Sequence, residues 1–587
     1  MNNTKHKLKL TYISSAITSF ARASGIAESG KKIGMEKEYR SLMQDLLYRI
    51  DGYSVNCDHG TLWNALTEKG HKKILKGLND PQRKQMIVMA DSGGLQQITL
   101  GINVTDEGRK EIFRRQAEFS THAMNFDEMP VLVNEALRDK FASQGNGDQG
   151  LKLNHSIKYF IKELRYDRGR ESGFNIKEQI DIIIDFKKNN PEKEVTKVLT
   201  IIQGWDIEDY NEYARGVYSV FNEMEEAERE KYYEHIGGIS LGTSGIISYF
   251  RMFDLYCRAP MDLTNVPERF RSFIHILGLG GNNKSGVLFA LQDNFFGKEV
   301  HYTYDSTSLT AASTFGKHII LEEKTTYKKG EQITFMNQRS QQLGRDISDK
   351  TVDFMKEVQD EYADLLQLHL GDSKMSADDF RNKYSPWRDD GCAGLKSFED
   401  KFDGKDGLIA REQYNNAISL NAYLHFALEA KTFMRLLDDM KRGDFNSISD
   451  NEYRKAMEKL FTIKTYDEYM KRRGEFKAIL GYIPNPGSEE AEWYEKTNRP
   501  LENSNEKRKS TMTYCQTVEE FNEICRSSVI DPLDDFMGDE DPTENIEKIT
   551  REYENSIDIP VKLTASQRVK AAADIILSRH NLDPEEW

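Results

Sequence analysis

The sequence predicts an α/β fold, a (β/α)8 barrel with insertions, followed by a mainly helical C-terminal region. From about residue 8 to 320, short β-like runs alternate with amphipathic stretches, a pattern typical of a parallel sheet covered by helices. Several of these runs end in polar residues. Catalytic groups at the C-terminal ends of successive strands are what such a barrel uses to build an active site. At 587 residues the chain also exceeds one ordinary core, so we expect further domains.

The barrel is expected to occupy residues 1–336. The runs that predict its strands are Lys84–Met89, Val198–Ile202, Ile236–Leu241, Phe273–Leu279 and Val300–Tyr304. The stretches that predict its helices are Asp106–Ala117, Ile176–Lys188, Tyr210–Tyr233 and Lys284–Leu291. Ser143–Gly150 is rich in Gly and polar residues, which indicates a flexible insertion. A hairpin over Lys317–Phe335, with Lys328-Lys329-Gly330 at its turn, is expected to end the barrel.

Beyond the barrel the apolar period becomes helical. We expect a helical region over 337–483 and a charged, mainly helical extension over 484–587, separated by the break Pro484-Asn485-Pro486-Gly487. The helices predicted there are Ser419–Lys441, Asn451–Arg473 and Ala565–Arg579.

The composition predicts a protein of the cytoplasm. The hydrophobic fraction is 38%, the mean hydropathy is -0.68, and no apolar run approaches the length of a membrane span. The N-terminus lacks the apolar core of a signal peptide, and five scattered cysteines favour reduced thiols. The net charge of -15 argues mildly against a nucleic-acid partner, but binding depends on a local basic surface rather than on the whole chain.

Five polar segments follow β-like runs, and the ordered set is more informative than any member. They are Asp91-Ser92-Gly93-Gly94-Leu95-Gln96, Phe126-Asp127-Glu128, Ile201-Ile202-Gln203-Gly204, His235-Ile236-Gly237-Gly238-Ile239 and Tyr304-Asp305-Ser306-Thr307. Singly, each has an ordinary explanation, such as a helix N-cap for Asp91 or a tight turn for Asp305. In this order, over roughly residues 8–335, they resemble the tRNA-guanine transglycosylase superfamily, which exchanges guanine in nucleic acid for a 7-deazaguanine.

The resemblance implies a role for each matching residue. Asp305 corresponds to the nucleophile: a carboxylate beneath the sugar C1′ carbon stabilises an oxocarbenium-like transition state and forms a covalent intermediate. Asp91 corresponds to the acid and base that moves the proton. Guanine presents donors at N1 and the 2-amino group and an acceptor at O6, which suits a carboxylate and an amide or N–H respectively. The substrate-binding residues that the resemblance implies are Ser92, Asp127, Gln203, Gly237, Gly238 and Ile239.

A Gly-rich segment follows the next-to-last predicted strand, where this fold often binds phosphate. We expect Gly280, Gly281 and Lys284 to contact the nucleic-acid backbone, although a plain strand-to-helix connection also explains the segment.

Several positions depart from the tRNA-acting enzymes. Those enzymes carry a Cys-x-Cys-x-x-Cys…His zinc site, whereas Cys392 has only His425 as a companion here, so we predict no metal and no cofactor. Their Pro-Thr-Arg segment after the nucleophile is Ser308-Leu309-Thr310 in this chain, an aromatic residue is replaced by Leu95, and Trp205 stands where a Gly is usual. This pattern is similar to the DNA-guanine transglycosylases of bacteriophages and bacterial DNA-modification clusters.

The sequence therefore predicts an enzyme that exchanges guanine in DNA, acting in the cytoplasm (the host cytoplasm if phage-encoded), with partner proteins left open. Thr243 in place of an acidic residue, together with Leu241, favours 7-cyano-7-deazaguanine as the incoming base. The alternatives are a divergent tRNA-guanine transglycosylase, a non-catalytic nucleic-acid-binding subunit of the same fold, and an unrelated glycosidase that uses Asp91 and Asp305.

Overall fold

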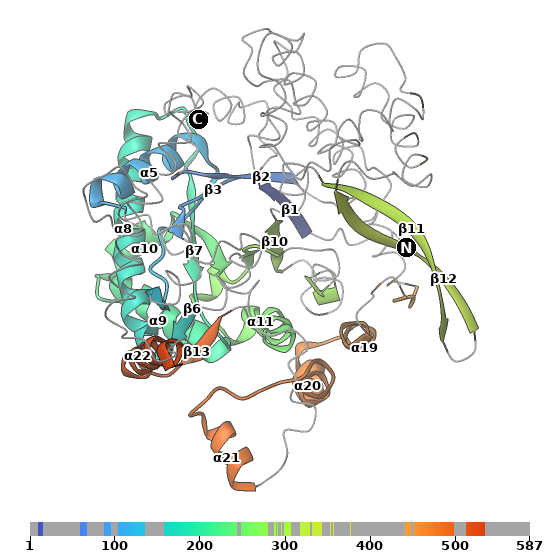
Figure 1. Ribbon diagram of the computed structural model, residues 1–587. Coiled ribbons are helices and arrows are strands. Elements are labelled where there is room, and N and C mark those ends of the chain that lie inside the picture. The colour runs from blue at the N-terminus through green and yellow to red at the C-terminus, as the bar shows by residue number, and fades with distance from the viewer. Residues whose placement is uncertain are drawn as a thin grey trace, which may run out of the picture.

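Eight parallel strands form a curled sheet at the centre of the computed structural model. The structure describes residues 10–15, 59–66, 87–94, 104–135, 158–242, 248–279, 301–306, 317–328, 331–342, 451–497 and 512–534, with isolated positions at 287–300, 353, 356, 376 and 440–448. Figure 1 shows the sheet with helices packed along one side and a long hairpin projecting away from it.

The strands of the sheet are hydrogen-bonded in the order β1-β10-β9-β8-β7-β4-β3-β2, and β1 pairs with both β10 and β2. Their bounds are Leu10–Ser15 (β1), His59–Asn64 (β2), Ile87–Asp91 (β3), His122–Met124 (β4), Lys197–Ile202 (β7), Ile236–Leu241 (β8), Phe273–Ile276 (β9) and His301–Ser306 (β10). All these pairs are parallel. All C-terminal strand ends therefore lie at one end of the sheet, and the prediction of an α/β fold is confirmed.

Helices connect successive strands wherever the connection is described. They are α5 (Asp106–Phe119), the short 3-10 turn Lys162–Leu164 that leads into α8 (Arg165–Asn189), α9 (Ile207–Asn222), α10 (Glu226–Tyr233), α11 (Tyr249–Asp262) and the 3-10 turn Glu268–Phe270. Thr105 and Asp206 cap α5 and α9 by accepting N–H groups of the first turn. The connections after β1, β2 and β9 lie largely outside the described residues, so the complete (β/α)8 pattern stays a prediction.

Side chains alternate between the two faces of the sheet. On the outer face Val88 and Ala90 of β3 pack with Ile112 and Phe113 of α5. On the inner face Met89 belongs to an apolar cluster with Leu62, Met124, Leu199 and Ile201, and Ile87, Phe273 and Leu277 pack at its margin. The interior of the curled sheet is therefore an apolar layer, and residues two positions further along each strand stand above it.

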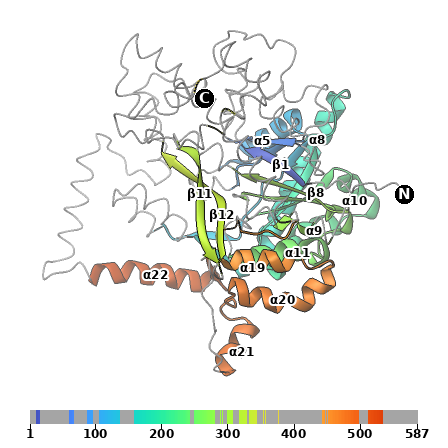
Figure 2. The ribbon, with the colours of Figure 1, turned by 90° about the vertical axis from the view of Figure 1, so that its right-hand side faces the viewer.

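Further elements lie outside the curled sheet. The hairpin consists of β11 (Lys317–Lys328) and β12 (Glu331–Gln342), paired antiparallel. A small sheet has the order β13-β6-β5 (Thr513–Cys515, Lys158–Ile161 and Val131–Val133). The remaining helices are α19 (Asn451–Leu460), α20 (Tyr466–Leu480), α21 (Glu489–Thr497) and α22 (Val518–Asp534). Figure 2 shows α19 and α20 lying along α11, whereas α22 packs against β6 and β13, where Phe521 contacts Tyr159.

Several sequence predictions are refined by these elements. The single helices predicted over Tyr210–Tyr233 and Asn451–Arg473 are each two helices, the second pair divided where Thr465 caps a new helix. The boundary predicted after residue 336 falls inside β12, and the C-terminal extension is tied to the barrel part because β13 pairs with β6. The predicted break at 484–487 lies between α20 and α21. The predicted helices Ser419–Lys441 and Ala565–Arg579 lie outside the described residues, except for position 440.

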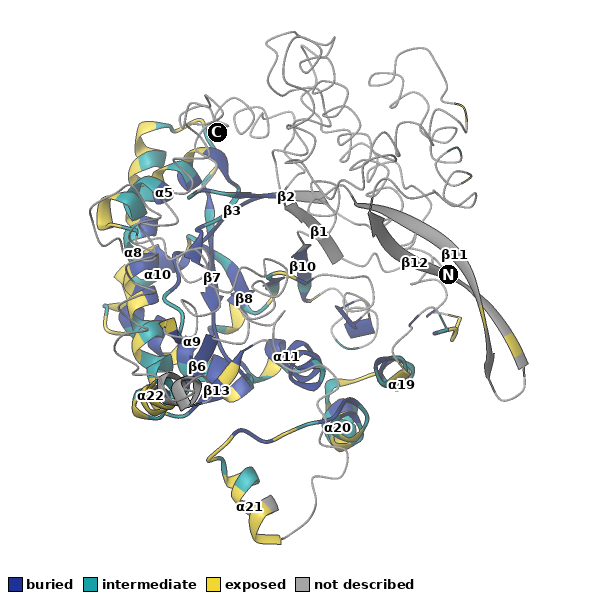
Figure 3. Cartoon of the chain, in the orientation of Figure 1, coloured by how far each residue is buried: buried dark blue, intermediate teal, exposed yellow. Residues whose placement is uncertain are grey.

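Burial follows this layering. Figure 3 shows β3, β7 and β8 and the inward faces of α8, α9 and α11 largely buried, with exposed residues on the outward faces of the helices. Within the part of the chain that the structure describes, no helix combines the length and the apolar character that crossing a membrane would need.

Candidate active site at the C-terminal strand ends

Three carboxyl groups gather at the C-terminal end of the sheet. Asp91 is the last residue of β3, Asp127 lies three residues after β4, and Asp305 is the last residue but one of β10. The negative charge of Asp305 raises the pKa of Asp91, and the charge of Asp91 in turn raises the pKa of Asp127. The structure thus brings together three residues that the sequence separates by more than two hundred positions.

Asp91 is held between two donors. Its Oδ1 accepts the Gly93 N–H at 3.3 Å, and its Oδ2 accepts the Asn64 side-chain amide at 3.4 Å. The Asn64 Oδ1 accepts the Leu66 N–H at 3.0 Å, which turns the amide nitrogen of Asn64 toward Asp91. Burial raises the pKa of Asp91 to about 6, with Asp305 adding to the effect and the Gly93 N–H opposing it. A carboxyl group with a pKa near neutrality can both give and take a proton.

Asp127 and Gln203 form a buried pair. The Gln203 Nε2 donates to Asp127 Oδ2 at 2.5 Å, and the two side chains belong to residues that are 5% and 3% exposed. Burial raises the pKa of Asp127 to about 7, and the hydrogen bond from Gln203 opposes that rise. An ionised carboxylate and an amide side by side offer an acceptor and a donor to one flat ligand.

Ser92 and Gln203 each have a buried side-chain oxygen without a partner in the part of the chain that the structure describes. Ser92 Oγ and Gln203 Oε1 make no hydrogen bond within the described residues, although both are buried. Buried polar groups in native proteins are almost always paired, since an unpaired one costs about 1–3 kcal/mol. Ser92 Oγ is therefore an atom that we expect a bound ligand to satisfy.

The carboxylate of Asp305 is held through one of its two oxygens. Its Oδ1 accepts the Gly278 N–H at 2.8 Å and lies 3.3 Å from His275 Nε2. Among the described residues, no hydrogen bond reaches Oδ2. Gly278 follows β9 and has φ +66°, a left-handed conformation that a glycine adopts readily. A carboxylate of a residue only 5% exposed, anchored through a single oxygen, leaves the other oxygen for a reacting atom.

Two glycines leave space for the buried pair of Asp127 and Gln203. A Cβ at Gly242 would lie 2.3 Å from Gln203 Nε2, and a Cβ at Gly94 would lie 2.5 Å from Asp127 Oδ1. Gly94 belongs to the motif that the sequence singled out, but Gly242 was not predicted as a site residue. The available signal for it was its place directly after the run Ile236–Leu241.

Gly237 and Gly238 are not brought to this cluster. Gly238 pairs with Leu199, four residues before Gln203, and a Cβ on it would meet Phe273 O at 2.4 Å. A Cβ on Gly237 would meet Lys197 at 2.7 Å. Lys197 and Phe273 are the first residues of their strands, so both glycines lie at the opposite, N-terminal end of the sheet. The sequence-based placement fails because β8 starts at Ile236 and ends at Leu241.

The remaining predicted residues are also accounted for. Ile239 and Leu241 direct their side chains into the main hydrophobic core between sheet and helices, so Leu241 does not form the wall of the base site that its position suggested. Other predicted positions lie outside the described residues, namely Thr243, Gly280, Gly281, Lys284, Cys392 and His425. Within the described residues, no group of three or more His, Cys, Asp or Glu side chains is arranged to hold a metal ion.

The segment after Gln203 is held by the C-terminal part of the chain. Trp205 packs against Phe160 and Tyr514, with ring centroids 6.1 and 5.6 Å apart. The Arg251 guanidinium lies 5.7 Å from the Trp205 ring and 5.1 Å from the Tyr482 ring. These contacts hold the chain immediately after Gln203 in place, so residues after 480 contribute to the shape of the site.

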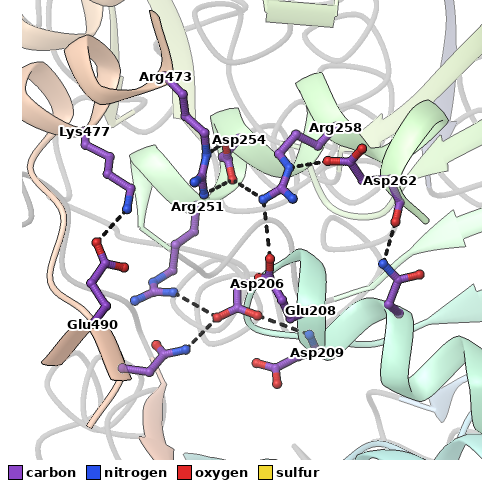
Figure 4. Close-up of polar contacts among 12 residues, drawn as sticks. Asp206, Glu208, Asp209, Arg251, Asp254, Arg258, Asp262, Arg473, Lys477 and Glu490 are labelled. Carbon is purple, nitrogen blue, oxygen red and sulfur yellow. Dashed lines mark hydrogen bonds and ion pairs between the residues drawn. The ribbon is translucent and has the colours of Figure 1, made fainter. Parts of the chain in front are cut away.

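A network of ion pairs joins α9, α11 and α20 beneath that segment (Figure 4). Asp254 accepts two hydrogen bonds from Arg473, at 2.6 and 2.7 Å, and one from the Tyr469 hydroxyl at 2.9 Å. Asp206 lies 3.5 Å from Arg251 and accepts from Asn485 at 2.6 Å. The network connects the C-terminal helices to the helices that pack on the sheet.

Comparisons with known proteins do not name a family for this architecture. No model of a protein family matches the chain, and no curated protein matches it either.

Proposed function

We propose that the chain is a DNA-guanine transglycosylase, built on a complete (β/α)8 barrel of which the described strands and helices are part. The observation that carries the proposal is the cluster of Asp91, Asp127 and Asp305 at one end of a parallel sheet, each influencing the next electrostatically. Such a cluster is costly to bury, so a fold that keeps it has a chemical use for it.

In the first step Asp305 Oδ2 attacks the sugar C1′ carbon. The C1′–N9 bond breaks, its electron pair leaves with guanine, and the Asp91 carboxyl group supplies the proton that the departing base takes up. The pKa of Asp91, about 6, leaves a usable protonated fraction at neutral pH. The product is a glycosyl ester on Asp305, which corresponds to the intermediate of retaining glycosidases.

In the second step the incoming base reverses these events. The Asp91 carboxylate takes a proton from N9 of the 7-deazaguanine, N9 attacks C1′, and the bond from C1′ to Asp305 breaks. Microscopic reversibility requires the same carboxyl group to serve both steps. No cofactor is needed, because each step exchanges one bond for another without a change in oxidation state.

Base recognition falls to Asp127, Gln203 and Ser92. The Asp127 carboxylate accepts from guanine N1–H and the 2-amino group, and Gln203 donates to O6 once the base separates the pair. Ser92 Oγ, which is buried and without a described partner, is available to the ligand. The case for DNA and for 7-cyano-7-deazaguanine rests on the sequence differences from tRNA-acting enzymes alone.

One labelling experiment tests the proposal. The full chain is incubated with labelled 7-cyano-7-deazaguanine and duplex DNA, single-stranded DNA or tRNA, with partner proteins added where they are known. Label in DNA supports the proposal, and label in tRNA alone would transfer the assignment to the tRNA branch. No label in any polymer, with release of a sugar from a glycoside instead, would favour an unrelated glycosidase.

Two variants assign the chemical roles. Asp305→Asn should abolish exchange, because the amide cannot form the ester. Asp91→Asn should slow the departure of guanine, leave attack at C1′ partly possible and block turnover, so a covalent DNA–protein adduct should be trapped in Asp91→Asn and not in Asp305→Asn. Asp185→Asn, which changes an exposed carboxylate on α8, is the matched control and should keep wild-type exchange. An adduct in Asp305→Asn but not in Asp91→Asn would exchange the two roles.

A further inference from the structure

A histidine that no motif predicted lies beneath Asp305. His275 is the one ionisable residue in β9 and is completely buried. Its neighbours two positions away, Phe273 and Leu277, contact the apolar layer inside the sheet, so His275 faces the same interior. A fully buried imidazole in an apolar layer needs hydrogen bonds at its nitrogens.

Both ring nitrogens of His275 have a contact. Nδ1 lies 2.8 Å from the hydroxyl of Thr303, which is itself completely buried, and Nε2 lies 3.3 Å from Asp305 Oδ1. A carboxylate only accepts, so a neutral imidazole must carry its proton on Nε2 to meet it favourably. Nδ1 then accepts, and the Thr303 hydroxyl is its donor. A hydroxyl can donate or accept, so the neighbouring carboxylate favours the tautomer with the proton on Nε2, and the Thr303 hydroxyl supports it by donating to Nδ1.

The contacts on Asp305 Oδ1 determine which oxygen of Asp305 is left to react. Oδ1 accepts the Gly278 N–H at 2.8 Å, and His275 Nε2 lies 3.3 Å from the same oxygen without forming a hydrogen bond among the described residues. A donor and an adjacent imidazole nitrogen on the same oxygen favour one rotamer of the carboxylate and leave Oδ2 without a described partner. A nucleophile gains most from this, since a reacting atom must be held in a near-attack position.

We propose that His275 is a positioning residue for Asp305: oriented by Thr303 and protonated on Nε2, it anchors Oδ1 so that Oδ2 is presented to the sugar C1′ carbon. This rests on the proposed function of the carboxyl cluster. It adds to that function a Thr303–His275–Asp305 chain of contacts across β9 and β10, in which the Thr303–His275 link is a hydrogen bond and His275 Nε2 lies 3.3 Å from Asp305 Oδ1.

Kinetics of three variants separate positioning from folding. His275→Leu and Thr303→Val each break the chain, and His275→Gln restores a neutral N–H donor at a similar reach. Thr200→Val is the matched control, because Thr200 is an equally buried strand hydroxyl, bonded to Tyr218 and to the Gly238 carbonyl, away from the carboxyl cluster.

We expect His275→Leu and Thr303→Val to lower kcat by about 10- to 100-fold, with KM for the base within about twofold of wild type. His275→Gln should recover most of the loss, and Thr200→Val should leave kcat unchanged. A kcat within about twofold of wild type in both His275→Leu and Thr303→Val would overturn the proposal.

A spectroscopic readout is independent of any reaction. In the full chain labelled with nitrogen-15 at histidine, the His275 signals, assigned by their loss in His275→Gln, should show a protonated Nε2 and a bare Nδ1. In Thr303→Val this pattern should become a mixture of tautomers. A protonated Nδ1 with a bare Nε2 in the wild-type protein would refute the arrangement. If wild type exchanges no base into any polymer, the proposed function fails, while this spectrum still decides whether His275 donates to Asp305.

Discussion

Replacing Asp127 by Asn should stabilise the protein at alkaline pH. Burial raises the pKa of Asp127 to about 7 from an ordinary value of 3.8, so the folded chain holds a proton that the unfolded chain has released. Between these two values the folded state binds more protons than the unfolded state, and stability must fall as pH rises. Above pH 7 the whole penalty is present, ~4 kcal/mol at ~1.36 kcal/mol for each pKa unit.

The Asn side chain avoids that penalty and keeps its neighbour. Gln203 Oε1 has no hydrogen bond within the described residues, so the Gln203 amide can turn over and accept from the new amide group. A neutral hydrogen bond is weaker than one to a carboxylate, so we expect a net gain of about 2–4 kcal/mol at pH 8.5. The gain should shrink by more than half at pH 5, where Asp127 is already protonated in the folded protein.

Urea unfolding at both pH values measures this difference. Wild type, Asp127→Asn and the exposed control Asp185→Asn are compared, and the control should follow wild type at both pH values. A gain of equal size at pH 5 and 8.5, or no gain at pH 8.5, would refute the reasoning from burial. Base exchange should be lost in Asp127→Asn, since an amide cannot accept both donors of guanine. The site would then be one where stability is sacrificed for function.

Three further outcomes follow from the same geometry. Gly242→Ala should raise KM for the base at least tenfold, because its Cβ would lie 2.3 Å from the Gln203 amide nitrogen, while Gly474→Ala, with open space around it, should be neutral or slightly stabilising in thermal unfolding. Asp254→Asn should lower the free energy of unfolding in urea by about 3 kcal/mol, because its arginine partners lose a buried counter-charge, and it should leave the chemical step unchanged. The pH profile of kcat/KM should fall as pH drops through about 7, where Asp127 gains a proton, and a flat profile from pH 5 to 8 would contradict its role as the acceptor.

The α/β class and most of the strands described here could be predicted from the sequence, because a buried parallel strand is a short continuous apolar run. Ile236–Leu241 matches β8 at both ends, and Val198–Ile202 differs from β7 by one residue. Helix breaks were harder to predict. The apolar period continues through Tyr210–Tyr233, and only tertiary packing reveals that α9 ends at Asn222. The pairing of β13 with β6 joins residues more than 350 positions apart and has no local signal.

At the site, motif matching identified Asp91, Asp127, Gln203 and Asp305, which the structure brings to one end of the sheet. It misplaced Gly237 and Gly238, because a Gly-Gly pair in a β-like run does not reveal at which end of the strand it falls. It also missed His275, Asn64 and Gly242. Their importance comes from which face of a strand they occupy, and that is known only once the register is known.

The register also explains why burial raises the pKa of Asp91. On three strands an inward-facing apolar residue is followed, two residues later, by a polar one. The steps are Leu62 to Asn64, Met89 to Asp91 and Ile201 to Gln203. The apolar layer excludes water from below and leaves only the open end for solvent or ligand. The same packing that closes the core therefore destabilises the ionised form of Asp91 and brings its pKa to about 6. In the proposed function, the ability of Asp91 to exchange a proton near neutral pH follows from its position where the apolar layer ends.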